Sequence, residues 1–152
     1  MAIRWLLLLT LLGLAVWFDW RHRRIPNRLL GVFATLAIAL SLLPASPGLL
    51  SALGAALLGA GVFLPLHLLG RMGGGDIKLM GTTGLLVGFD HMAGLCLAVA
   101  LCGGVLAMVW AWRQIHSPHP VDAMAARMPY ALAIAAGTLA QGLYAARLAS
   151  LS

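Results

Sequence analysis

Residues 49–70 read LLSALGAALLGAGVFLPLHLLG, an apolar run without a formally charged side chain. A helix needs about 20 such residues to cross the hydrocarbon core of a bilayer. The run is followed by a basic and glycine-rich segment, residues 71–78, which reads RMGGGDIK. This pattern predicts a membrane-spanning helix that ends in a polar loop.

The composition of the whole chain agrees with a membrane protein. Of the 152 residues, 62% are hydrophobic and only 9% are charged, whereas soluble domains have about 25% charged residues. No polar stretch approaches the roughly 50 residues that a separate domain needs. We therefore expect one integral-membrane domain, residues 1–152, without a separate soluble domain.

Six apolar stretches divide the chain and predict an all-α fold with six transmembrane helices. The third, fifth and sixth stretches are long enough to span a bilayer, and the first and second are long enough with their flanks. The fourth is too short, so we expect a half-length helix buried in protein or lining a wet cavity. The stretches are residues 5–18, 29–43, 49–70, 79–89, 92–112 and 128–146.

The basic residues are distributed unevenly between the two sides of these spans. Eight of the ten Lys and Arg residues follow the first, third and fifth stretches, and only Arg4 and Arg147 belong to the other side. The positive-inside rule then places those three loops in the cytoplasm and both termini outside. Because no soluble surface presents the net charge of +6, we expect the lipid bilayer as a partner and no nucleic acid.

Two carboxylates occupy unusual positions. The chain has four acidic residues, all aspartate, and Asp19 and Asp76 lie where apolar spans meet basic or glycine-rich loops. A carboxylate at a span end is costly to desolvate and is usually kept for function or for a specific partner. The structural alternatives are an ion pair of Asp19 with a nearby arginine, and Asp76 as the N-cap of a helix starting at Ile77.

Two aspartates at one membrane face permit peptide hydrolysis. One carboxylate must be ionised to take a proton from water, and the other must be protonated to polarise the scissile carbonyl. Neighbouring carboxylates in a low-dielectric site supply this split because both cannot ionise, as in the aspartic proteases. This chemistry needs no cofactor, and since no C-x-x-C pattern occurs, we expect no metal site.

The residues around Asp76 suggest how it is presented. Gly73 and Gly75 allow positive φ angles or close backbone approach, which leaves room for an extended substrate. Lys78 either balances the charge of the dyad and contacts substrate, or anchors a span at the interface. His67, inside the third apolar stretch, is either a hydrogen-bond donor within the bundle or a neighbour of the dyad.

Three segments resemble the type IV prepilin peptidases. Residues 19–27, DWRHRRIPN, are similar to the first motif of that family, and residues 73–80, GGGDIKLM, to its G-x-G-D motif with the following x-K-L. Pro129 and Tyr130 resemble the Pro-Tyr/Phe segment that opens its last helix. Pro26 and Asn27 are also explained as a turn and an N-cap at the start of the second span.

The resemblance implies an aspartyl endopeptidase of the plasma membrane that removes the short basic leader of prepilins or pilin-like proteins at the cytoplasmic side. The catalytic pair would be Asp19 and Asp76. The chain lacks the zinc-binding insertion of the larger members and resembles the compact ones, those of tight-adherence pilus systems and the archaeal preflagellin peptidases, so methyltransferase activity is not carried over. The alternatives are a non-enzymatic bundle, either a small transporter or a pilus-assembly scaffold, and a presenilin-like G-x-G-D protease.

Overall fold

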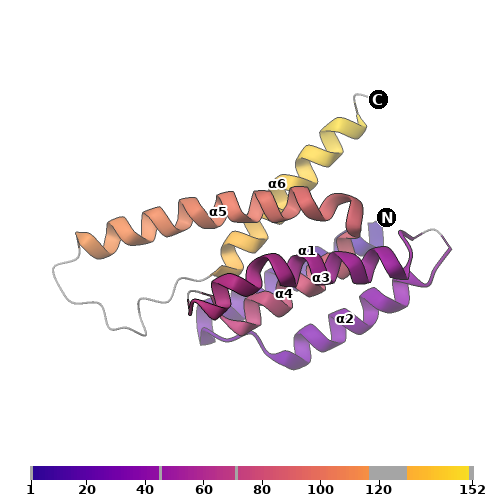
Figure 1. Ribbon diagram of the computed structural model, residues 1–152. Coiled ribbons are helices and arrows are strands. Elements are labelled where there is room, and N and C mark those ends of the chain that lie inside the picture. The colour runs from indigo at the N-terminus through magenta and orange to yellow at the C-terminus, as the bar shows by residue number, and fades with distance from the viewer. Residues whose placement is uncertain (1, 45, 71, 117–129, 151–152) are drawn as a thin grey trace.

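A computed structural model describes residues 2–44, 46–70, 72–116 and 130–150. These residues form six α-helices (Figure 1), so the predicted all-α fold is confirmed. The helices are α1 (Ala2–His22), α2 (Asn27–Ser41), α3 (Leu49–Leu68), α4 (Gly74–Val87), α5 (Phe89–Ile115) and α6 (Tyr130–Ala149).

Three of the described helices are long and apolar enough to cross a membrane, namely α1, α3 and α5, and α2 is a shorter apolar helix. As expected, α4 is short, but it begins at Gly74 and so includes most of the glycine-rich segment that we expected to be a loop. We expected the sixth stretch to qualify as a span by itself. It forms the 20-residue helix α6, whose apolar sequence is interrupted by polar residues such as Gln141.

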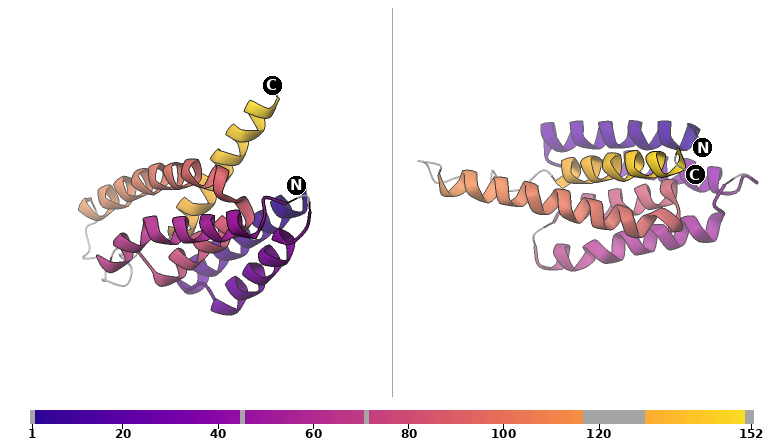
Figure 2. Two further views of the ribbon diagram at one scale, coloured as in Figure 1. Left: turned by 45° about the vertical axis from the view of Figure 1, so that its right-hand side comes forward. Right: turned by 90° about the horizontal axis from the view of Figure 1, so that it is seen from above.

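From α1 to α5, successive helices run in opposite directions, so the connections between these five helices lie at two ends of the bundle (Figure 1). The α1–α2 and α3–α4 connections share one end, and the N-terminus lies near the α2–α3 connection at the other. Gly48 and Gly88 have φ angles of 88° and 86° at the starts of α3 and α5, a conformation that favours glycine. The C-terminal part of α6 leans away from the other helices (Figures 1 and 2).

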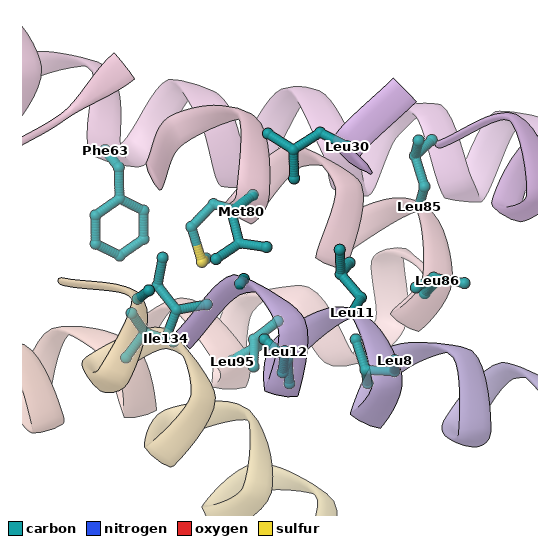
Figure 3. Close-up of a cluster of buried hydrophobic side chains, with 14 of the residues drawn as sticks. Leu8, Leu11, Leu12, Leu30, Phe63, Met80, Leu85, Leu86, Leu95 and Ile134 are labelled. Atoms are coloured by element: carbon teal, nitrogen blue, oxygen red, sulfur yellow. The ribbon is translucent and has the colours of Figure 1, made fainter. Parts of the chain in front are cut away.

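The core lies where all six helices meet. Figure 3 shows side chains from each of them converging on α4, with Met80 near the middle of the cluster. Met80 and Leu79 are fully buried, as are Leu11 of α1 and Ile134 of α6. Burial of residues on most faces of α4 explains how a helix too short to span the bilayer is held in place.

Candidate active site

Asp19 lies in the last turn of α1, at the end of the bundle where α1 and α2 connect. The helix ends at His22, three residues after Asp19. There the backbone N–H of Arg23 donates to the carbonyl oxygen of Asp19 at 2.9 Å, and Arg23 has a φ angle of 51°. A residue of positive φ is a common way to end a helix. The chain therefore turns towards α2 within one helical turn of Asp19.

The Asp19 side chain is half-buried and has a backbone partner on another helix. A backbone hydrogen bond links its carboxylate to Ala131 in the first turn of α6, and Arg23 interacts with it electrostatically. Its Oδ2 atom is buried and lacks a hydrogen-bond partner among the described residues. A buried carboxylate oxygen without such a partner is costly and points to a functional role.

Asp76 is the third residue of α4 and is only 8% exposed. The Gly73 N–H donates to Asp76 Oδ2 at 3.2 Å, and the Asp76 N–H donates to the Gly73 carbonyl at 3.1 Å. The interpretation of Asp76 as an N-cap is therefore wrong, because the N-cap position belongs to Gly73. An acidic side chain in the first turn still favours the helix, since it faces the unpaired N–H groups there.

The glycines before Asp76 serve close packing. Gly73 has a φ angle of −71°, and positive φ among the described glycines occurs only at Gly48, Gly70 and Gly88. The expectation of positive φ at Gly73 or Gly75 is therefore wrong. A Cβ atom added at Gly75 would lie 3.4 Å from Cβ of Ile25. The segment that follows Asp19 thus packs directly against the segment that carries Asp76.

His67 supports the same loop from α3. Its Nδ1 atom lies 2.8 Å from the carbonyl oxygen of Met72, and because a carbonyl only accepts, Nδ1 donates. A Cβ atom at Gly74 would lie 3.5 Å from the His67 ring. Of the two roles considered for His67, the structure therefore supports the hydrogen-bond donor that holds the loop.

Lys78 and Asn27 connect the two motifs a second time. The Lys78 Nζ atom donates to Asn27 Oδ1 at 3.0 Å, and both side chains are exposed. The prediction that Asn27 caps α2 is wrong, because Pro26 occupies the N-cap position and its carbonyl accepts from Leu29 and Leu30. The Asn27 amide oxygen is instead used between helices.

Tyr130 brings α6 to the site. Its ring packs edge-on against Phe63 with centroids 6.2 Å apart, and it interacts electrostatically with Asp76. Gly103 on α5 leaves room for the ring, since a Cβ atom there would lie 2.9 Å from Cζ of Tyr130. Pro129, the other residue of this motif, lies outside the described residues.

Two neighbouring residues of α6 therefore lie near the aspartates: a backbone hydrogen bond links Ala131 to Asp19, and Tyr130 is near enough to Asp76 to interact with it electrostatically. Neither Ala131 nor Gly103 was predicted from the sequence as a site residue. The role of Ala131 rests on its backbone N–H, which leaves no signal in the residue type. The arrangement brings two carboxyl groups from separate helices to one end of α6, where one can act as base and the other as acid.

Comparison with known proteins assigns most of the chain to a family. The model of the type IV leader peptidase family matches residues 6–108. The match includes both aspartates and ends before α6. The comparisons with curated proteins and with solved structures gave no match.

Proposed function

The chain belongs to the type IV leader peptidase family, and from this premise we propose that it is an aspartyl endopeptidase with Asp19 and Asp76 as its catalytic pair. The observation that carries the proposal is the contact between the two segments that bear the aspartates: Ile25 packs on Gly75 and Lys78 donates to Asn27, and the first turn of α6 lies near both carboxyl groups. The family implies pilin-like substrates and a membrane setting. The substrate is then a membrane-inserted precursor whose short basic leader is cut off at the cytoplasmic side.

In the proposed reaction the two carboxyl groups share one proton. The ionised carboxylate takes a proton from water as the water attacks the scissile carbonyl carbon. The protonated carboxyl group donates to the carbonyl oxygen, which gives a tetrahedral intermediate. The carboxyl group that took the proton from water then gives it to the leaving nitrogen, the other carboxylate takes a proton from a hydroxyl group of the intermediate, and the carbon–nitrogen bond breaks, so the dyad again holds one proton. Its two titrations belong to the pair, so neither residue is assigned one role.

The contacts of the loop before Asp76 would hold the catalytic groups in position. His67 fixes the carbonyl of Met72, and the Gly73 N–H binds Asp76 Oδ2. Ile25 packs on Gly75 and thereby ties the segment after Asp19 to the same loop. Such support keeps two catalytic groups from different helices in register, and small displacements of reacting groups are expensive in rate.

The test is the replacement of each aspartate in the purified, membrane-reconstituted protein. We expect Asp19→Asn and Asp76→Asn each to reduce cleavage of a pilin-like precursor by roughly 10³-fold or more, because the dyad needs both carboxyl groups. Asp90→Asn is the matched control, since Asp90 is exposed at the start of α5, next to the turn at the opposite end of the bundle. Near-normal cleavage by either dyad variant, with its fold retained in circular dichroism, would contradict the assignment.

A further inference from the structure

A groove runs between α2 and α4 on the outside of the bundle. It is shallow and wide open to the surroundings, has a volume of about 500 Å³, and its lining includes Asn27, Gly31 and Ala34 of α2 and Lys78, Gly81 and Leu85 of α4. The lining residues of each helix recur every three or four positions, so they form one face of about two turns. The groove therefore follows the helix axes into the apolar part of the protein.

One end of this groove adjoins the candidate active site. Gly75, next to Asp76 in the chain, precedes Lys78 by three residues, so Gly75 and Lys78 lie on the same face of α4. Asn27 follows Ile25 by two residues, and Ile25 packs against Gly75. The hydrogen bond between Lys78 and Asn27 therefore marks the place where the groove opens beside the catalytic loop.

The polar end and the apolar remainder of the groove differ in what they can bind. Lys78 has three N–H donors, and among the described residues one of them is used, on Asn27, which leaves two for other acceptors. Beyond this pair, Gly31 has no atom within 4 Å of an added Cβ atom, so the α2 wall is bare there. A helix backbone can approach another helix closely where small residues lie between them.

We propose that this groove receives the membrane-spanning helix of the precursor, with the bond to be cut just beyond the Lys78–Asn27 pair. The proposal rests on the proposed function. A protease must unwind the segment that it cuts, and the carbonyl oxygens of that segment lose their helical partners. Lys78 and Asn27 can donate to those carbonyls while the helix below lies between α2 and α4. The cleaved bond then lies within a few residues of the start of the substrate helix.

The experiment fills the groove with a side chain. Gly31→Leu places apolar bulk in the open space, and Gly61→Leu is the matched control because Gly61 on α3 also has nothing within 4 Å of an added Cβ atom. Two substrates are compared: a precursor with its membrane helix, and a peptide that ends shortly after the cleaved bond. We expect the ratio of kcat/KM for precursor to kcat/KM for peptide to fall about tenfold in Gly31→Leu, mainly through KM, and to stay at the wild-type value in Gly61→Leu.

The outcomes separate the two proposals. If the wild-type protein cuts neither substrate, the proposed function fails. If it cuts both and the two leucine variants give the same ratio, the groove holds only lipid and the docking proposal is overturned.

A cross-linking measurement covers the case in which Gly31→Leu does not fold. Gly31→Cys and Gly61→Cys are made in an Asp76→Asn, Cys96→Ala, Cys102→Ala background, and the precursor carries one cysteine in its helix. We expect disulfide capture of the precursor from position 31 and none from position 61. Equal capture from both positions would also overturn the proposal.

Discussion

Gly73, the N-cap residue of α4, contacts the carboxylate of Asp76. Its N–H donates to Asp76 Oδ2, and a Cβ atom added to it would lie 3.0 Å from that same oxygen. The backbone of Gly73, with φ −71° and ψ 146°, is one that alanine adopts without strain. Replacement by alanine therefore displaces the carboxylate without a backbone penalty.

We expect Gly73→Ala to lower kcat at least about tenfold while KM changes little, because the methyl group moves a reacting group rather than a binding contact. Gly74→Ala is the control in the same turn, since its Cβ atom would make only an ordinary 3.5 Å contact with His67. Steady-state kinetics on both variants, with thermal unfolding to check the fold, make the measurement. Equal kcat values for the two variants would show that the position of the Asp76 carboxylate does not depend on Gly73.

For single residues, the sequence predicted which side chains belong to the candidate site better than it predicted what they contact. The motif segments identified Asp19, Asp76 and Lys78 as candidates, because charged groups beside apolar spans are rare and costly. The local interpretations of Asp76 and Asn27 as N-caps were wrong, because in the folded protein those positions belong to Gly73 and Pro26. The oxygen of Asn27 is bound instead by Lys78, which is 51 residues away in the chain, and no local pattern reports such a contact.

The packing of α4 on α3 depends on glycines at the contact between the two helices. A Cβ atom at Gly84 would lie 2.6 Å from the carbonyl oxygen of Ala55, and one at Gly59 would lie 3.1 Å from the carbonyl oxygen of Met80. Close approach of helix backbones through small residues is a usual source of stability inside membranes, where the hydrophobic effect between helices is weak. This contact positions α4, and with it Asp76, relative to the long helix α3.

We expect Gly84→Ala to destabilise the protein by about 1–3 kcal/mol, because an added methyl group in a tight contact forces the backbones apart. Gly61→Ala is the matched control: it has open space around the new methyl group and gains helix propensity of about 1 kcal/mol. The two substitutions should therefore shift the midpoint of unfolding in detergent in opposite directions. A Gly84→Ala protein as stable as wild type would mean that the helices separate at little cost.

The boundaries of the helices show where apolar patterning is informative. The apolar run of residues 49–70 predicted both ends of α3 to within two residues. A long uncharged run can satisfy its backbone hydrogen bonds in a bilayer only as a helix. The helix start considered at Ile77 is three residues later than the observed start of α4 at Gly74, because three consecutive glycines suggest a loop. In the structure, contacts from Ile25 and His67 and the Gly73–Asp76 hydrogen bonds hold these glycines in helical or extended conformations.

Across the whole molecule, polar contacts occur at both ends of the apolar bundle. At the end opposite the site, Arg4 donates to the Leu86 carbonyl at 3.3 Å and to Ser41 Oγ at 3.1 Å, which joins α1, α2 and α4. The gathering of the motifs at one end followed from the alternation of apolar spans. The contribution of α6 through its backbone did not, because it depends on how a distant helix docks.

The last prediction concerns the orientation of the bundle in the membrane. The α1–α2 connection and the residues around it carry Arg21, Arg23, Arg24 and Arg28, and such clusters are retained in the cytoplasm. In a Cys96→Ala, Cys102→Ala background, we expect His22→Cys to react with a membrane-impermeant maleimide in inverted vesicles and not in intact cells. Ser46→Cys, between α2 and α3, should show the reverse pattern.

Gly74→Cys provides the internal control for this measurement, because Ile25 packs beside it at Gly75 and positions 22 and 74 must therefore share one side. If both react only in intact cells, the bundle is inverted and cleavage at the cytoplasmic side is excluded. If they react from opposite sides, the packing of the two motif segments is wrong, and with it the dyad, because Asp19 and Asp76 could not then meet at the start of α6. Labelling of both from the cytoplasmic side places the dyad where a basic leader, itself retained in the cytoplasm by its charge, can reach it.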